Sequence, residues 1–165
     1  MLAVNRSVVI VEPDQLAQRK LLRLLSAEPG IDSVRCCCGY RDGAHTVSRH
    51  PPDLLLVGAD APLLSAALPG GADAALPPGV VLTTTYAPEL APLEAPLNLL
   101  FKPFDATRFR AALARIAGQE AVPVLPTVHW LLRLARVATP CAAAPLNGYG
   151  MPEWLLADRL RLDPC

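Results

Sequence analysis

Short, largely apolar runs recur along the chain, and segments with helical spacing of polar and apolar residues separate most of them. The first run covers residues 7–11 and is rich in β-branched side chains. Four further runs follow along the chain, at residues 33–38, 53–57, 79–85 and 97–101. Runs without polar alternation are typical of strands that are buried on both faces of a parallel sheet. The pattern therefore predicts five strands, the first of them central.

The segments between these runs differ in how well they suit a helix. Asp14, Asp42 and Asp105 each precede or open a segment with helical periodicity and are placed to cap it. Two other connections, residues 61–78 and 86–96, are interrupted by proline. A proline inside a helix costs roughly 3 kcal/mol. We therefore expect the third and fourth crossovers to be short or irregular.

Strand and helix alternate from residue 7 to about residue 118, which predicts an α/β fold with a doubly wound, five-stranded parallel sheet. A chain of 165 residues is long enough for one such domain and too short for two domains with a linker. We therefore assign residues 1–118 to this domain and residues 119–165 to a Pro/Ala-rich C-terminal extension.

The extension contains two segments with the spacing of short helices, residues 127–138 and residues 152–162. Three polar side chains share one face of the first segment: His129, Arg133 and Arg136. Each segment carries one tryptophan, Trp130 in the first and Trp154 in the second. Both are too apolar to be solvated on all sides. They are expected to pack either on the domain or on a partner, since aromatic side chains are enriched at interfaces.

Positive and negative charges balance over the whole chain, with 15 Lys and Arg against 15 Asp and Glu. Nucleic-acid binding is not expected, because phosphates are usually neutralised by a basic face, and a polybasic membrane contact is disfavoured for the same reason. No run approaches the roughly 18 to 20 apolar residues of a membrane span. Glu12 and Asp14 also interrupt the first run too early for a signal peptide. We therefore expect a cytoplasmic protein with no membrane contact.

The order of these elements resembles that of a response-regulator receiver domain of two-component signalling. The matching segments are VIVEPDQLAQRKLLRLL, PDLLLVGADAP, VVLTTTY and LLFKPFDATRFRAALARI. They cover about two thirds of the chain, and the Lys-Pro-Phe-Asp that follows the last apolar run is the strongest single match. The resemblance implies a flavodoxin-like fold and a cis peptide bond between Lys102 and Pro103.

The resemblance also implies a phosphoacceptor pocket at the ends of the strands. In the family, an aspartate after the third strand takes the phosphoryl group, and an acidic pair after the first strand helps it to hold Mg²⁺. A hydroxyl after the fourth strand and a lysine after the fifth contact the phosphoryl group. These family positions fall in this chain on Glu12 and Pro13, Gly58, Thr84 and Lys102.

Two of these positions carry a residue that cannot perform the family's chemistry. Gly58 has no side chain to phosphorylate, and Pro13 offers no second carboxylate. Because phosphoryl transfer needs a nucleophile in line and a hard cation, the pattern indicates a degenerate pseudo-receiver that is not an enzyme and binds no cofactor or metal. Such a protein would act through contact with a signalling protein or with a second copy as a homodimer. Lys102 is expected to pair with Glu12 or Asp14.

Asp60 leaves a second hypothesis open, because it lies two positions beyond Gly58. Together with Glu12 and Asp14 it could form a displaced acidic pocket beside Lys102 and accept a phosphoryl group. A shift of two residues moves a side chain roughly 6 to 7 Å along an extended chain, so the loop would have to rearrange. Thr84 has a structural interpretation too, because β-branched residues are favoured in strands.

The resemblance implies a contact surface formed by the fourth crossover, the fifth strand and the last helix of the domain. The residues proposed for protein contact, with the two tryptophans of the extension, are Tyr86, Leu99, Phe101, Phe104, Trp130 and Trp154. A third hypothesis is a DNA-associated transcriptional regulator in which the extension contacts DNA only as a dimer. Four arginines in a neutral extension make this the weakest of the three.

Overall fold

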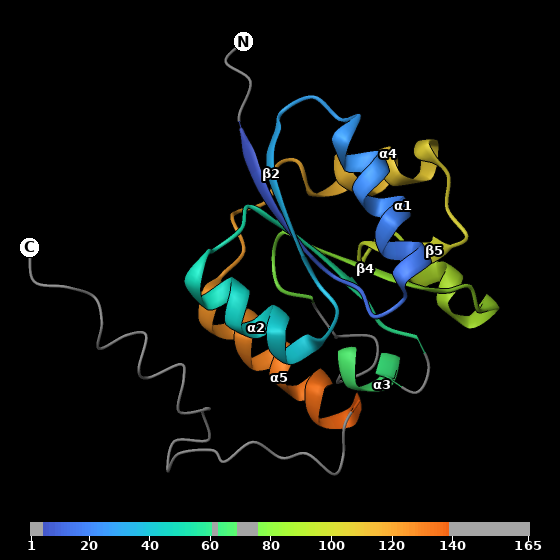
Figure 1. Cartoon of the computed structure of the whole chain (residues 1–165). Coiled ribbons are helices and arrows are strands. Elements are labelled where there is room, and N and C mark those ends of the chain that lie inside the picture. The colour runs from blue at the N-terminus through green and yellow to red at the C-terminus, as the bar shows by residue number, and fades with distance from the viewer. Residues whose placement is uncertain (1–4, 61–62, 69–75, 139–165) are drawn as a thin grey trace, which may run out of the picture.

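A single parallel sheet forms the centre of the molecule (Figure 1). The computed structural model describes residues 5–60, 63–68 and 76–138. Its strands are β1 (Arg6–Val11), β2 (Ile31–Cys37), β3 (Leu54–Gly58), β4 (Val80–Thr85) and β5 (Leu99–Lys102). All four pairings are parallel and the order is β2-β1-β3-β4-β5, the flavodoxin-like order. The fold class predicted from the sequence is therefore confirmed.

Helices follow the strands and are capped mostly as the sequence predicts. They are α1 (Gln15–Ser26), α2 (Tyr40–Arg49), α3 (Leu63–Ala67), the 3₁₀ helix η2 (Pro88–Leu93), α4 (Ala106–Ile116) and α5 (Val124–Ala138). Asp14 accepts hydrogen bonds from two backbone N–H groups of α1, and Asp105 accepts one from the first turn of α4. The predicted cap at Asp42 is wrong, because α2 begins two residues earlier with Gly39 at its N-cap and Asp42 in its first turn.

The described helices of the third and fourth crossovers are short, as predicted. Helix α3 has five residues, and the fourth crossover contains only the 3₁₀ helix η2 with Pro92 inside it. Helix α5, which corresponds to the first predicted helix of the extension, packs against α2 and α3. Its Trp130 donates a hydrogen bond from Nε1 to the carbonyl oxygen of Ala67 over 2.9 Å. The second predicted helix, with Trp154, lies outside the described residues.

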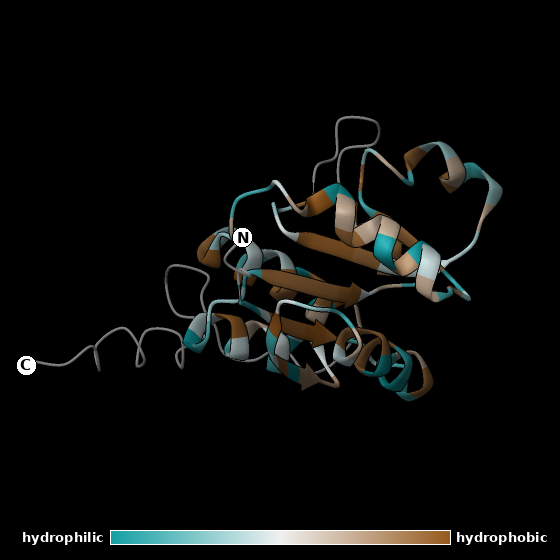
Figure 2. Ribbon diagram, turned by 90° about the horizontal axis from the view of Figure 1, so that it is seen from above, coloured by the Kyte–Doolittle hydropathy of each residue, from teal (hydrophilic) through white to brown (hydrophobic). Residues whose placement is uncertain are grey.

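Apolar side chains fill both sides of the sheet. Figure 2 shows the central strands coloured as hydrophobic. On one side, α1 and α4 cover a cluster that includes Ile10, Leu56 and Leu100. On the other side, α2 and α5 cover a cluster that includes Val57 and Leu82. Because neighbouring residues of a strand point to opposite faces, this division fixes the face on which each strand-end residue lies. No helix in the described part of the chain is long and apolar enough to cross a bilayer.

Candidate functional site

The carboxyl ends of three strands bring together three of the residues that were expected to lie there. Glu12 follows β1, Gly58 ends β3, and Lys102 ends β5. Each lies two residues after a member of the cluster that α1 and α4 cover, namely Ile10, Leu56 and Leu100. Because alternate residues of a strand point to the same side, all three lie on the side of the sheet that faces α1 and α4. Ligands bind at this edge in open parallel sheets.

The Glu12 carboxylate is buried at the centre of this edge, with only 2% of the side chain exposed. The Thr83 hydroxyl donates a hydrogen bond to Oε2 over 2.9 Å, and the backbone N–H of Asp14 donates one to Oε1 over 3.0 Å. The ammonium of Lys102 lies 3.3 Å from Oε2. A buried carboxylate requires such partners, because removal from water penalises its charged form.

Gly58 borders this carboxylate directly. A Cβ atom built on Gly58 would overlap the carboxylate of Glu12, whose Cδ and both oxygens are its nearest neighbours. The Glu12 side chain therefore occupies the space into which a side chain at position 58 would project. This contact could not be predicted from the sequence, because it depends on the direction that Glu12 takes at the end of β1.

Lys102 joins two carboxylates rather than one. Its Nζ lies 3.3 Å from Oε2 of Glu12 and 3.3 Å from Oδ2 of Asp60, and 15% of its side chain is exposed. Asp14, the other predicted partner of Lys102, instead caps α1 through its side chain and reaches the site only with its backbone N–H. The peptide bond between Lys102 and Pro103 is cis, as the resemblance implies.

Asp60 lies at the rim of the same edge, with 44% of its side chain exposed. Its Oδ1 accepts hydrogen bonds from the backbone N–H and the hydroxyl of Thr85, the latter over 2.7 Å. Partial burial alone would raise the pKa of Asp60, but the hydrogen bonds from Thr85 and the charge of Lys102 lower it overall. Asp60 is therefore held ionised beside Lys102.

The hydroxyl groups at this site belong to Thr83 and Thr85, and the prediction of Thr84 is wrong by one residue. Thr83 donates to Glu12 and Thr85 donates to Asp60. Thr84 lies between them in β4 and therefore points to the opposite face, where it is buried. Gly58 is directly opposite Thr83 in the β3–β4 register, which is the signal that identifies the correct threonine.

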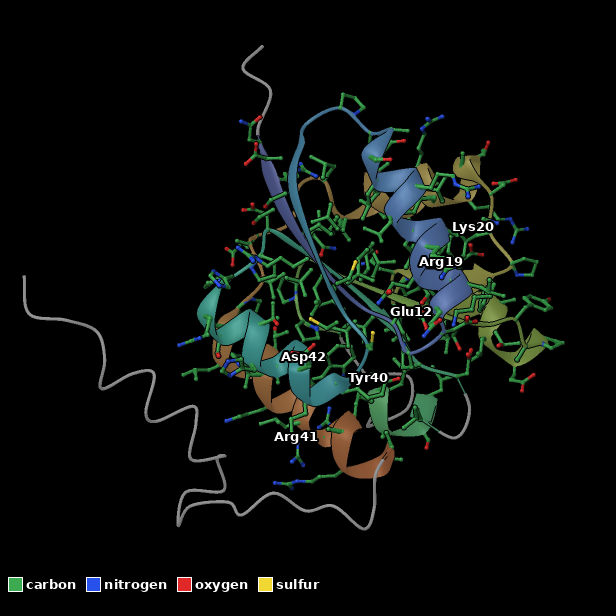
Figure 3. All side chains as sticks on the ribbon, in the orientation of Figure 1. Glu12, Arg19, Lys20, Tyr40, Arg41 and Asp42 are labelled. Carbon is green, nitrogen blue, oxygen red and sulfur yellow. The ribbon has the colours of Figure 1, made fainter. Side chains whose placement is uncertain are left out.

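Tyr40 is a further residue of the site that the sequence did not reveal. It opens α2, is buried, and donates a hydrogen bond from its hydroxyl to the carbonyl oxygen of Gly58. Burial raises the pKa of Tyr40, and the negative charges of Glu12 and Asp60 raise it further. The hydroxyl therefore stays protonated and fixes the backbone at Gly58. Figure 3 labels Glu12 near the start of α1 and Tyr40 at the start of α2.

Most of the predicted contact surface is buried. Leu99 and Phe101 belong to the core under α2 and α5, and Phe104 belongs to the core under α1 and α4. Trp130 is buried as well, so none of these four side chains is available to a partner in this structure. Tyr86 is the exception, with 54% of the residue exposed and its ring packed edge-on against Phe101. The apolar side chains that were assigned to an interface form the core instead.

The divalent cation that the resemblance implies does not fit the side chains present. Gly58 and Pro13 contribute no oxygen ligand from a side chain. The carboxylates of Glu12 and Asp60 both face the ammonium of Lys102. Within residues 5–60, 63–68 and 76–138, no three His, Cys, Asp or Glu side chains form a group that could hold a metal ion.

Comparison with known proteins gives matches among solved structures alone. No family model matches the chain, and no curated protein matches it. The response regulatory domain of mrkE from Klebsiella pneumoniae is 20% identical with a TM-score of 0.45, over 67% of this chain and 94% of that one. The signal receiver domain of a modulated diguanylate cyclase from Desulfovibrio desulfuricans is 23% identical with a TM-score of 0.44, over 67% and 92%.

The anti-anti-sigma factor PhyR from Bartonella quintana is 15% identical with a TM-score of 0.48, and the match covers 68% of this chain and 48% of PhyR. At such values the likeness concerns the arrangement of the chain, and no function is transferred from it. The fold class rests on the strand order and the crossovers described above.

Proposed function

We propose that this chain is a receiver-like signalling module of a two-component type of pathway that accepts no phosphoryl group and acts through contact with a partner protein. One observation carries the proposal. The Glu12 carboxylate fills the space beside Gly58, where the receiver resemblance places the phosphoacceptor side chain. Position 58 therefore has neither a nucleophile nor room for one in this arrangement.

The charges at the site support the same proposal. Phosphoryl transfer to a carboxylate requires a cation that neutralises the developing negative charge. Here the ammonium of Lys102 already neutralises Glu12, and Thr83 and the backbone of Asp14 satisfy the carboxylate oxygens. The site has the character of a permanent ion pair, not of a pocket that awaits a reactant.

A module of this kind would signal through its conformation or its abundance. A partner can shift a protein between two states only if it binds them with different affinity, and no covalent change is needed for that. The end of β3 is connected to its neighbours at Gly58: Tyr40 of α2 donates a hydrogen bond to it, and the carboxylate of Glu12, after β1, borders it. Lys102 of β5 pairs with Glu12, so these contacts would stabilise one of the two states.

The proposal is tested by incubating the full chain with acetyl phosphate and Mg²⁺ and measuring the intact mass. We expect no gain of mass, while a receiver domain with its acceptor aspartate gains one phosphoryl group in a parallel reaction. A phosphoryl adduct on this chain at the level of that control would overturn the proposal.

Asp60 supports a second candidate function, an atypical response regulator that is phosphorylated on this residue. Gly58 and Thr83 are opposite each other in the register, and Asp60 and Thr85 repeat that pair two residues further along. Lys102 contacts Asp60 as well. This repeats the set of carboxylate, hydroxyl and lysine that the resemblance implies for phosphorylation.

Two features make this candidate the weaker one. Oδ1 of Asp60 already accepts two hydrogen bonds from Thr85, and Oδ2 faces Lys102. The mass measurement separates the two functions: phosphorylation of Asp60 predicts an adduct that requires Mg²⁺ and disappears in Asp60→Asn. An adduct that persists in Asp60→Asn would exclude this candidate.

A further inference from the structure

Three consecutive cysteines lie at the carboxyl end of β2, which is an edge strand of the sheet. Cys37 is the last residue of the strand and is buried, and its thiol lies 3.3 Å from the hydroxyl of Thr46 in α2. Cys36 and Cys38 are exposed, and all three cysteines are free thiols. Two thiols are therefore open to solvent at this end of β2.

The two exposed thiols lie on the same side of the sheet. Cys36 is directly opposite Ile10 in the β1–β2 register, and Ile10 belongs to the cluster under α1 and α4. Cys38 contacts the same layer, because the side-chain amide of Gln18 in α1 donates to its sulfur atom over 3.9 Å. Cys37 lies between them in the sequence and points to the other side, toward α2. Cys36 and Cys38 therefore form a pair from which Cys37 is excluded.

The two sulfur atoms of this pair are close enough to influence each other. Burial raises the pKa of the Cys36 thiol, and the negative charge of Cys38 raises it further. Two neighbouring thiolates repel each other, so the doubly ionised pair is unfavourable on its own. A cation that binds both sulfur atoms removes this repulsion, because its positive charge lies between them.

The spacing of the pair suits a bridging ion better than a disulfide. Side chains two residues apart on a strand are separated by about 6.6 Å. A disulfide requires its Cβ atoms to approach to roughly 3.5 to 4.5 Å, so the end of the strand would have to bend. A metal–thiolate bond is about 2.3 Å long for zinc, so an ion between two thiolates spans sulfur atoms about 4.6 Å apart. Sulfur atoms that lean toward each other from the two strand positions reach that separation.

We infer that Cys36 and Cys38 bind one Cu⁺ ion through their two sulfur atoms. Thiolate ligands select soft ions such as Cu⁺ and Zn²⁺. Structural zinc sites are almost always four-coordinate, whereas Cu⁺ is stable between two thiolates. Within residues 5–60, 63–68 and 76–138, no third His, Cys, Asp or Glu side chain joins the pair in a group that could hold a metal ion. Two ligands therefore favour Cu⁺ over Zn²⁺.

Binding forms two Cu–S bonds and releases the two thiol protons to solvent, and the oxidation states of copper and sulfur do not change. The site is separate from the carboxyl-edge ion pair of Glu12 and Lys102, and it departs from the sequence-based expectation that the chain binds no metal. The inference goes beyond the proposed function and does not depend on it.

The inference is tested by anaerobic titration of the full chain with Cu⁺ in competition with the chromophoric chelator bicinchoninate. Cys141 and Cys165 lie outside the described residues, so both are replaced by serine in every protein that is compared. We expect one Cu⁺ per chain and tighter binding as the pH rises, because the thiols must lose their protons. Cys36→Ser and Cys38→Ser should each weaken binding roughly 10²- to 10⁴-fold, because one of two linked ligands is lost.

The matched control is Cys37→Ser, which removes the neighbouring thiol on the other side of the sheet. It should change the affinity less than about threefold, because this thiol points away from the pair. Circular dichroism establishes that the three variants are folded, and Cys37→Ala gives the same comparison if Cys37→Ser does not fold. X-ray absorption at the copper edge should show two sulfur ligands.

Several results would overturn the inference. They are a lack of Cu⁺ binding, equal losses in Cys37→Ser and Cys36→Ser, or one ion shared between two chains. Loss of two hydrogens from the intact mass after treatment with oxidised glutathione, in a chain that binds no Cu⁺, would identify a disulfide pair instead. The phosphorylation assay is separate, so a chain that takes neither a phosphoryl group nor Cu⁺ contradicts this inference and leaves the proposed function standing.

Discussion

Two layers of polar residues lie at the carboxyl edge of the sheet, and they use the same chemistry at different depths. The inner layer, Glu12 and Thr83 beside Gly58, is buried. The outer layer, Asp60 and Thr85, is open to solvent. Each pairs a carboxylate with a threonine hydroxyl, and Lys102 contacts both. The comparison teaches that depth decides the role: the inner carboxylate is a structural counterion, and the outer one remains accessible.

Removing the ammonium of Lys102, which contacts both carboxylates, should lower the free energy of unfolding the most. Lys102→Met leaves the buried Glu12 carboxylate without its counterion, and loss of one partner of a buried ion pair typically costs about 3 to 5 kcal/mol. We expect the free energy of unfolding, measured with urea, to fall by about 3 kcal/mol. Lys20→Met is the control, because Lys20 is exposed and its ammonium lies over the Phe104 ring at 5.2 Å. A similar loss in both variants would contradict the assignment of Lys102.

Substitution of Thr83 and of Thr85 compares the contributions of the inner and outer layers to stability. Thr83→Val removes a hydrogen bond to a buried carboxylate and should lower the free energy of unfolding by about 2 kcal/mol. Thr85→Val changes the exposed layer and should cost less than about 1 kcal/mol. Urea unfolding of both proteins gives the comparison directly. If Thr85→Val is the more damaging of the two, the depth argument is wrong.

Asp60 should make the smallest contribution, and that contribution should depend on pH. Its pKa is lowered in the folded protein, so its stabilisation is present above the unfolded pKa of about 3.9 and is lost as the pH falls through the folded value. Because 44% of the side chain is exposed, Asp60→Asn should cost less than about 1 kcal/mol at pH 7. The difference from the unchanged protein should shrink as the pH falls below about 4 and vanish once the pH is below the folded pKa. A difference that grows on acidification would contradict this sign.

Strand positions could be predicted from the sequence because continuous apolar runs have few alternatives in a chain of this length. The face of the sheet to which each strand residue points could not be predicted. A strand that is buried on both faces shows no polar alternation, so nothing in the three consecutive threonines marks which of them faces Gly58. The structure assigns Thr83 and Thr85 to the site and Thr84 to the other face.

Four of the six residues predicted for the contact surface are buried, for a related reason. Apolar residues such as Leu99, Phe101 and Trp130 suit an interface and a core equally well, and composition does not separate the two. Helix α5 packs against α2 and the short helix α3, and its Trp130 and Leu131 join the core that contains Leu99. The sequence shows that both helix and sheet are apolar, but not that they cover each other.

The central claim is that the Glu12 carboxylate occupies the space beside Gly58. A double-mutant cycle measured by urea unfolding tests this claim most directly. In the unchanged background, Gly58→Ala should lower the free energy of unfolding by about 1 to 3 kcal/mol, because the added Cβ overlaps the Glu12 carboxylate. In the Glu12→Ala background that space is free, so we expect Gly58→Ala to be neutral or to stabilise by about 0.4 to 1 kcal/mol. An equal cost of Gly58→Ala in both backgrounds would contradict the account.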